Sequence, residues 1–334
     1  MKKILLCGSI VSASLLLAAM PAAAQGPNNS GTYYKQANGK SGSALKAALH
    51  NIIKTHTKRT YSQLYTDYKT TDIRPDGKIW DMYSSTSNFT PGTDENHSSF
   101  HQEGDNYNRE HSMPASWFDS DKQSAMYTDL MHVIPADSYV NNRRSNYPYG
   151  ETSNPTYQSN GGFSKLGNAK SGLGYSGKVF EPNDEYKGDF ARIYFYMATC
   201  YADKIADWSS DMLAGNSYPA FTTWALNMLL RWAENDPVSE KELNRNAAVY
   251  GIQNNRNPFV DYPGLEQMIW GDLQGVAFSY DNYNSPTGII ELASDETTAR
   301  EQQPGSVYDM QGRRVRHIRQ HGMYIRNGKK FIAN

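Results

Sequence analysis

Apolar residues recur at helical spacing in four parts of the chain. Residues 189–205 have apolar positions three and four apart, and residues 219–235 and 239–250 carry patterns that also favour helices. The Asp236-Pro237 pair separates the last two segments, because the residue before a proline disfavours helix. The same spacing over residues 41–55 predicts an amphipathic helix whose apolar face is formed by Leu45, Ala48, Leu49, Ile52 and Ile53.

Other stretches lack helical spacing. Residues 76–84 join an Asp-Gly turn signal to a short apolar run, and they predict a turn followed by a strand. Residues 85–108 are polar with little periodicity, so we expect a loop. Residues 152–188 are rich in Gly, Asn and Ser, which is typical of a long excursion over the surface. The densest polar chemistry lies in residues 109–151.

The first residues have the features of a secretory signal. Lys2 and Lys3 precede an apolar run over residues 4–20, and small residues follow in an Ala-x-Ala arrangement. A transmembrane anchor is the alternative, but the apolar run is short and ends at Pro21. We therefore expect cleavage after Ala24 and a secreted product, either extracellular or periplasmic.

The last part of the chain, residues 281–334, has a different character. Residues 294–306 are polar and contain a Pro-Gly pair, so we expect a linker. The predicted organisation is thus a leader at 1–24, a main domain at 25–280 and a short β-rich tail. In the tail, short apolar runs separated by glycines predict strands joined by turns at 307–310, 314–315, 323–325 and 331–332.

Charge and cysteine content narrow the classes of protein. The 334 residues include 33 Lys+Arg and 34 Asp+Glu, for a formal net charge of −1, and the mean hydropathy is −0.71. These values fit a globular protein, exclude a polybasic one and give no sign of a nucleic-acid binder. Cleavage of the leader leaves Cys200 as the one cysteine, so we expect no disulfide. Its apolar neighbours predict a buried structural thiol.

Two polar clusters carry the candidate chemistry, and their members are Arg109, Glu110 and His111 in the first and Asn141, Arg143 and Arg144 in the second. A carboxylate and a carboxamide oxygen, together with water, are ligands that suit Mg²⁺. A neutral imidazole beside the metal can deprotonate water, and arginines can bind phosphate oxygens through paired donors. These groups together indicate phosphodiester hydrolysis.

Spacing argues against other sites at the Glu110-His111 pair. A zinc protease would need H-E-x-x-H or H-x-x-E-H, and Tyr107 stands where the second pattern needs histidine. The chain has no cysteine cluster for structural zinc and no G-x-S-x-G motif placed after a strand. The following histidines are interpreted as surface or helix-face residues: His50, His56, His97, His101, His317 and His321.

At these clusters the sequence resembles the bacterial endonuclease I family, secreted or periplasmic nucleases of the ββα-metal, or His-Me finger, fold. Residues 108–111, followed by Pro114 and Trp117, are similar to the active-site signature of the family, and residues 129–151 are similar to its next block. The resemblance covers about residues 41–272, because further similar segments follow in order at 79–84, 179–182, 187–192 and 255–259.

The resemblance implies a role for each matching residue. His111 is expected to be the general base, and Glu110 and Asn141 are expected to bind one Mg²⁺ ion, with Mn²⁺ or Ca²⁺ as alternatives. Arg144 aligns with a family arginine and is expected to contact phosphate. For the two remaining arginines of the clusters, Arg109 and Arg143, phosphate contact and a structural ion pair are equally supported.

The resemblance also implies a fold and an activity. We expect an α+β fold, with a mainly helical nuclease domain that contains a ββα-metal finger and a short β-rich tail. We expect a monomeric, Mg²⁺-dependent endonuclease that hydrolyses DNA, and RNA as well, with little sequence preference. His132 lies in a family-like Asp-x-x-His segment and is expected to be structural.

Several alternatives stay open. The tail resembles a Bacteroidetes secretion-sorting segment, which implies contact with a secretion machinery, and a small β appendage is the other interpretation. An inactive secreted module that binds nucleic acid is one alternative, and the presence of Glu110, His111 and Asn141 together argues against it. A phosphodiesterase for small substrates is the other. Because the net charge is near zero, any nucleic-acid binding is expected to depend on a local basic patch and the metal.

Overall fold

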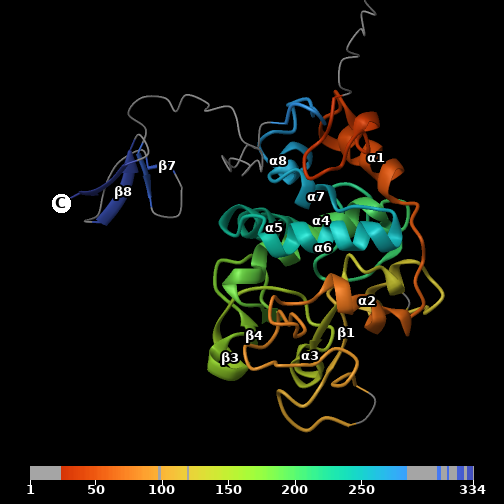
Figure 1. The fold of residues 1–334 in the computed structure, drawn as a ribbon, viewed down its shortest axis with the longest axis vertical. Helices are drawn as coiled ribbons and strands as arrows, with labels where there is room; N and C mark the ends of the chain where they lie inside the picture. Colours follow the sequence, from red (N-terminus) through yellow and green to blue (C-terminus); the bar gives the residue numbers. More distant parts are fainter. Residues whose placement is uncertain are drawn as a thin grey trace, which may run out of the picture.

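A computed structural model describes residues 24–96, 99–118, 120–283 and four strands of the tail. Helices α4, α5 and α6 cross the middle of the main body, with α1, α7 and α8 on one side and the strands β1, β3 and β4 with α3 on the other (Figure 1). The helix bounds are α1 Gly42–Ile53, α2 Gln63–Thr71, α3 Ser138–Arg144, α4 Lys187–Cys200, α5 Thr223–Asn235, α6 Glu240–Gln253, α7 Pro258–Asp261 and α8 Leu265–Ile269.

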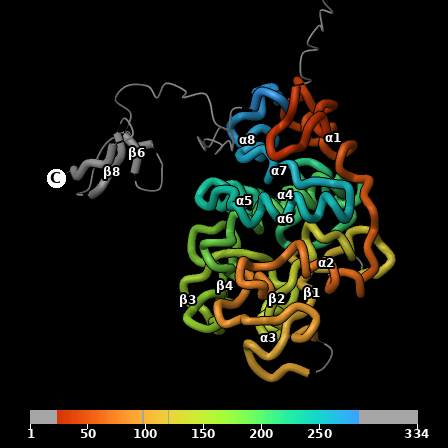
Figure 2. The backbone as a smooth tube through the Cα atoms, in the orientation of Figure 1, coloured from red at the N-terminus to blue at the C-terminus, as the bar shows by residue number. Residues whose placement is uncertain are grey.

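Single-turn 3₁₀ helices connect several of these elements, and the path of the chain through them can be followed in Figure 2. Their bounds are η1 Lys35–Ala37, η2 Ala115–Trp117, η3 Met126–Thr128, η4 Asn160–Gly162, η5 Asp184–Tyr186 and η6 Ile205–Asp207.

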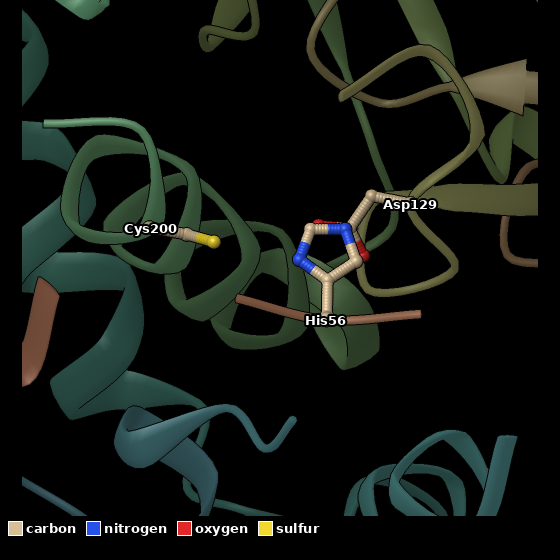
Figure 3. A group of neighbouring side chains, drawn as sticks. All are labelled: His56, Asp129 and Cys200. Atoms are coloured by element: carbon tan, nitrogen blue, oxygen red, sulfur yellow. The ribbon is translucent and has the colours of Figure 1, made fainter. Parts of the chain in front are cut away.

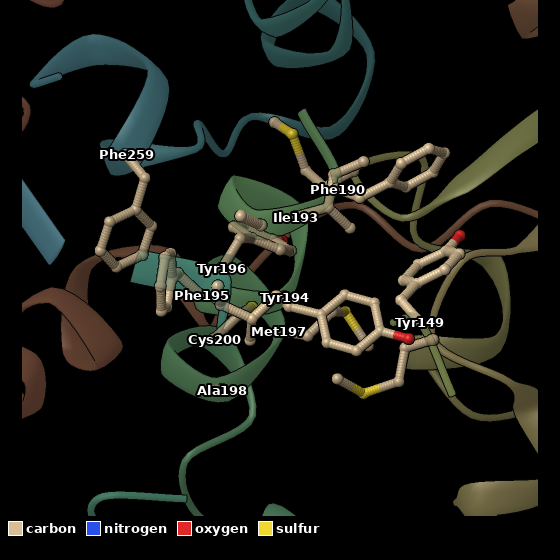
Figure 4. Packing of buried hydrophobic residues seen from close by; sticks show 14 of the residues in the cluster. Tyr149, Phe190, Ile193, Tyr194, Phe195, Tyr196, Met197, Ala198, Cys200 and Phe259 are labelled. Carbon is tan, nitrogen blue, oxygen red and sulfur yellow. The ribbon is translucent and has the colours of Figure 1, made fainter. Parts of the chain in front are cut away.

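Helix α4 forms the centre of the core. All of its residues except Lys187 are buried, including the charged residues Asp189 and Arg192. Its aromatic residues reach in opposite directions (Figure 4). Phe190 packs on Tyr149 with the ring centroids 4.7 Å apart, and Phe195 packs on Phe259 of α7 at 5.6 Å. This helix therefore joins the strand-containing half of the molecule to the helical half.

The predicted helices are confirmed with small shifts at their ends. The predicted segments 41–55 and 219–235 contain α1 and α5 entirely. The segments 189–205 and 239–250 contain most of α4 and most of α6. Helix α6 starts with a capping box, in which Ser239 and Glu242 satisfy each other's backbone N–H groups. The short helices α2, α7 and α8 were not predicted, because each spans too few turns for its apolar spacing to be recognised.

Three separate antiparallel sheets are present among the described residues. Strand β1 pairs with β2, three strands follow in the order β3-β4-β5, and four strands of the tail lie in the order β7-β6-β8-β9. The mixture of helix and strand agrees with the α+β class. The strand bounds are β1 Tyr107–His111, β2 Val133–Asp137, β3 Thr152–Gln158, β4 Lys165–Ala169, β5 Lys178–Glu181, β6 Val307–Asp309, β7 Arg314–Val315, β8 Gly322–Arg326 and β9 Lys329–Ala333.

Two sequence predictions were wrong. Residues 76–84 contain the turn, but Ile79 forms only an isolated bridge to Ile73 and no strand follows. The cause is Asp81, whose carboxylate accepts a hydrogen bond from the backbone N–H of Tyr83 and bends the chain. Residues 152–188 carry β3, β4 and β5 instead of an unstructured excursion. Strand β3 is mostly exposed, so its sequence lacks the alternation that marks a half-buried strand.

The ends of the chain bear on the remaining predictions. The expected leader at 1–24, apart from its last residue, and the expected linker at 294–306 lie outside the described residues. The four short strands predicted in the tail are all present. Across the described parts of the chain, the structure has no helix with the length and apolar character needed to span a membrane.

Close packing of α4 against the end of α5 gives a stability prediction. A Cβ atom on Gly188 would overlap the backbone carbonyl oxygen of Asp236, so Gly188→Ala should lower the free energy of unfolding by roughly 1–3 kcal/mol. Gly251 on α6 has open space around it, so Gly251→Ala should raise this free energy by about 0.5–1 kcal/mol. Urea denaturation of both variants measures the difference, and effects of the same sign would contradict this packing.

Candidate active site

Strands β1 and β2 and helix α3 form a ββα unit. The two strands pair antiparallel, with Glu110 opposite Ile134 and His111 opposite Val133. Helix α3 begins directly after β2, because the Asp137 carboxylate accepts hydrogen bonds from the backbone N–H groups of Tyr139 and Val140. The end of β1 and one face of α3 are thereby brought together.

Alternation along β1 divides its polar side chains between two faces. Asn108 and Glu110 point toward α3, where they contact Asn141 and Arg144 respectively. Arg109 points to the opposite face and stacks on tyrosine rings. The unit thus holds an oxygen-rich face and an aromatic face on the same short strand.

Arg144 binds the Glu110 carboxylate in a buried ion pair. Its Nη1 lies 2.5 Å from Oε1 of Glu110 and 2.9 Å from the carbonyl oxygen of His111, and its Nη2 lies 2.6 Å from the carbonyl oxygen of Ser112. The side chain of Arg144 is only 1% exposed. This guanidinium is therefore enclosed behind the carboxylate and faces protein acceptors on several sides.

The two oxygens of the Glu110 carboxylate differ in their hydrogen bonds. Oε1 accepts from Arg144 and from the hydroxyl of Tyr83 at 2.9 Å, whereas the described residues provide no hydrogen bond to Oε2. Burial raises the pKa of Glu110 to about 7, although Arg144 and Tyr83 act in the opposite direction. A cation at Oε2 would favour the charged carboxylate.

Asn141 lies one helical turn before Arg144, on the face of α3 that meets β1. Its Nδ2 donates to Oδ1 of Asn108 at 2.6 Å, which leaves its own Oδ1 as an acceptor. The carboxylate of Glu110 and the carboxamide of Asn141 are hard oxygen donors, so the residues present fit Mg²⁺ or a similar divalent ion.

His111, at the end of β1, is held in one tautomer. Its Nε2 lies 2.9 Å from the carbonyl oxygen of Tyr127, which can only accept, so Nε2 carries the proton and Nδ1 keeps its lone pair. Burial, with a smaller effect of His132, lowers the pKa of His111 to about 3. The imidazole is therefore neutral at physiological pH and can act as a base.

Asp129 fixes the segment that carries the Tyr127 carbonyl. Its Oδ1 accepts from the backbone N–H of Met131 and from Gln253 of α6, and its Oδ2 accepts from the hydroxyls of Tyr196 and Tyr201. Burial acts to raise the pKa of Asp129, but nearby histidines and these hydrogen bonds hold it below its ordinary value. The η3 segment is thus joined to helices α4 and α6.

His132 also stabilises this segment. It is fully buried, and its Nε2 donates to the carbonyl oxygen of Met126 at 2.6 Å. Burial lowers the pKa of His132 to about 4, so the ring is neutral. This placement agrees with a structural role.

His56, Asp129 and Cys200 form a second group that could hold a metal ion, with ligand atoms within 4.8 Å of one another (Figure 3). The His56 side chain is 2% exposed, so it is not the surface residue that was predicted. Cys200 is buried, as predicted, and burial raises the pKa of its thiol. A His/Asp/Cys set suits Zn²⁺ better than Mg²⁺, and Asp129 already accepts four hydrogen bonds.

The other two predicted arginines lie on different surfaces. Arg109 is partly buried, and its Nη1 donates to the carbonyl oxygen of Tyr61 at 2.9 Å. Arg143 is exposed on α3, with its guanidinium carbon 4.7 Å from the centre of the Tyr139 ring and its Nη2 2.5 Å from that hydroxyl. Of the predicted set, only Arg144 contacts Glu110 directly.

Comparison with known proteins places the chain in a family. A model of the family described as endonuclease I matches residues 41–264, which is more than half of the chain. The chain belongs to the endonuclease I family. An extracellular ribonuclease of Bacillus amyloliquefaciens is 37% identical over 244 residues, which cover 72% of this chain and 78% of the relative.

Other relatives agree with the endonuclease I family. An extracellular ribonuclease of Bacillus subtilis is 34% identical over 265 residues, which cover 77% of this chain and 84% of the relative. An endonuclease-1 of Buchnera aphidicola from Acyrthosiphon pisum is 27% identical over 139 residues, 42% of this chain and 46% of the relative.

The sequence did not indicate every residue that shapes the site of this endonuclease I homologue. Tyr83 and Tyr127 contact Glu110 and His111 from 27 and 16 positions away in the chain. Tyr127 acts through its backbone carbonyl, which no side-chain pattern can reveal. Asn108 was noted only as part of the signature, although its spacing of two from Glu110 places it on the same face of the strand.

The two neighbouring arginines of α3 provide a matched test of burial. Arg144→Ala should lower the free energy of unfolding by about 3–5 kcal/mol, because Glu110 would stay buried without its partner. Arg143→Ala should change it little, since that side chain is exposed. Urea denaturation followed by circular dichroism measures both, with Arg144→Lys as an intermediate variant that keeps the charge. Equal effects at the two positions would contradict the described ion pair.

Proposed function

We propose that this protein is a secreted, metal-dependent endonuclease that hydrolyses phosphodiester bonds in DNA and RNA. The observation that carries the proposal is the neutral imidazole of His111, held by the Tyr127 carbonyl, on the residue that directly follows the buried Glu110 at the end of β1. A fixed base next to oxygen donors for a divalent ion is what attack by water on a phosphodiester needs.

His111 acts as the general base in this proposal. Its Nδ1 accepts a proton from a water molecule aligned opposite the scissile P–O bond. The Nε2–H of His111 keeps its hydrogen bond to the Tyr127 carbonyl oxygen, which stabilises the imidazolium that forms. Burial keeps water away from the ring faces and holds the free base neutral before the reaction.

Glu110 and Asn141 would hold one divalent ion, Mg²⁺ in the first place, with Mn²⁺ or Ca²⁺ as alternatives. Such an ion supplies charge stabilisation to the phosphate oxygens as negative charge develops. Arg144 keeps Oε1 of Glu110 in place and Asn108 orients the carboxamide of Asn141. We assign to Arg144 this positioning role rather than the expected phosphate contact, because its guanidinium is enclosed.

Phosphate binding is assigned to Arg143, which is exposed on the same short helix as Asn141. Backbone contacts of this kind carry no base information, so little sequence preference is expected. Relatives named extracellular ribonuclease support activity on RNA, and a relative named endonuclease-1 supports cleavage within a nucleic-acid chain. They also support secretion, together with the basic and apolar leader of the sequence.

His111→Ala should reduce cleavage by on the order of 100-fold or more, because no base would remain to take the proton. The rates are measured on plasmid DNA, RNA and a small phosphodiester, with His101→Ala as the control, since His101 is exposed. Near-normal cleavage by His111→Ala would refute the assignment. Binding without cleavage by the unaltered protein would indicate an inactive binding module, and cleavage of the small substrate alone would indicate a different phosphodiesterase.

Metal dependence gives a second test. EDTA should abolish cleavage and added Mg²⁺ should restore it. Asn141→Ala should raise the Mg²⁺ concentration needed for half-maximal rate by roughly 10-fold or more, since one ligand is lost. The neighbouring exposed residue provides the control, because Asn142→Ala should leave the Mg²⁺ titration unchanged. Activity that is indifferent to EDTA, or equal titrations for the two variants, would argue against this metal site.

A further inference from the structure

The aromatic face of β1 holds a stack of side chains beside the candidate base. Arg109 and His111 lie two positions apart on this strand, and both meet Tyr61, which precedes helix α2 in the chain. Tyr65, on the first turn of α2, and Tyr127 complete the group. We call these five residues the Tyr61 stack.

Arg109 lies between two rings of the Tyr61 stack. Its guanidinium carbon is 3.7 Å from the centre of the Tyr61 ring and 4.1 Å from the centre of the Tyr65 ring. Its Nη1 also donates to the carbonyl oxygen of Tyr61. A planar cation enclosed by two aromatic faces is strongly oriented, and the additional hydrogen bond fixes the backbone at Tyr61. Both tyrosine rings therefore contact the guanidinium.

Tyr61 in turn contacts the base. Its ring is nearly parallel to the His111 imidazole, with an interplanar angle of 19° and centroids 6.1 Å apart. Tyr127 packs against both rings, at 4.4 Å from His111 and 5.2 Å from Tyr61. Two tyrosine rings thus restrict the movement of the imidazole, and the Tyr127 carbonyl oxygen accepts a hydrogen bond from its Nε2–H.

From this geometry we infer that Arg109 and Tyr61 are positioning residues for His111, and that Arg109 is not a phosphate ligand. The inference rests on the proposed role of His111 as the base. Arg109 holds the Tyr61 ring in place, and the Tyr61 ring keeps Nδ1 of His111 directed at the attacking water.

The position of His111 in the fold explains why such support is needed. It is the last residue of β1, and the bond from the Ser112 N–H to the His132 carbonyl oxygen continues the pairing by one residue. These backbone bonds hold the strand end but do not by themselves orient the imidazole. Tyr61 belongs to an irregular segment between α1 and α2 that has no sheet partner of its own. The cation stack and the hydrogen bond from Arg109 join this segment to the strand. Displacement of a catalytic group by about 1 Å can cost on the order of 100-fold in rate.

Kinetics can separate positioning from phosphate contact. Arg109→Ala and Tyr61→Ala should each lower kcat by on the order of 10- to 100-fold, with KM and its dependence on salt unchanged. Tyr61→Phe should keep nearly full activity, because the ring and not the hydroxyl makes the stack. Arg109→Lys should restore kcat only in part, since an ammonium group does not stack as a plane.

Arg143→Ala is the matched comparison, because Arg143 is the exposed arginine assigned to phosphate. It should raise KM and reduce the slope of log(kcat/KM) against log[salt] by about 1. If Arg109→Ala behaves in this way with kcat unchanged, Arg109 contacts phosphate and the inference is wrong. A loss of activity in Tyr61→Phe equal to that in Tyr61→Ala would also overturn it.

Thermal melting of each variant shows whether a loss of kcat reflects unfolding. If either alanine variant fails to fold, Tyr61→Phe and Arg109→Lys still decide, because the inference requires near-normal kcat in the first and lowered kcat at unchanged KM in the second. The His111→Ala result keeps the two proposals distinguishable. Full activity without His111 would refute the proposed function, whereas an inactive His111→Ala with normal kcat in the Arg109 variants would refute only this inference.

Discussion

The buried guanidinium of Arg144 constrains the whole site. A charge removed from water must be matched by acceptors, and the two terminal nitrogens of Arg144 meet this requirement with the Glu110 carboxylate and the carbonyl oxygens of His111 and Ser112, whereas its Nε has no hydrogen-bond partner among the described residues. Tyr149, whose ring lies under the guanidinium, packs in turn on Phe190 of α4. The end of β1, the helix α3 and the helical core are therefore held in an arrangement that gives both terminal nitrogens of this cation their acceptors.

Burial of this ion pair is not a simple source of stability, because removing both charges from water costs free energy that their attraction offsets only in good geometry. The ion pair instead fixes the orientation of the Glu110 carboxylate. With Oε1 of Glu110 occupied by Arg144 and Tyr83, the other oxygen is left for a ligand. Because the strand alternates, fixing Glu110 on one face also fixes His111 on the other, where the Tyr127 carbonyl sets its tautomer. The end of one short strand thereby sets the orientation of both side chains, the carboxylate of Glu110 and the imidazole of His111.

The parts of this arrangement that follow local rules could be predicted from sequence. Helices such as α1 and α5 form where the apolar spacing predicts them. The Glu110-His111 pair could be identified because the residues of the family signature follow one another in the chain. The role of Arg144 could not be predicted, since an exposed and a buried arginine look alike in sequence and Arg143 stands next to it. The role of the Tyr127 carbonyl could not be predicted either, because its position depends on hydrogen bonds that Asp129 makes to residues distant in the chain.

Charge balance was the least informative sequence feature, and the structure explains why. Several arginines form ion pairs with buried carboxylates inside the protein, so they add little to the electrostatic field at the surface. These pairs are Arg144 with Glu110, Arg192 with Glu242, Arg245 with Asp72 and Arg256 with Asp261. A net charge counts these internal pairs as if they faced solvent. In the proposed function, binding of a polyanion would then depend on the cations that remain at the surface, such as Arg143, and on an ion at Glu110. Such binding is local, and screening by salt acts on it directly.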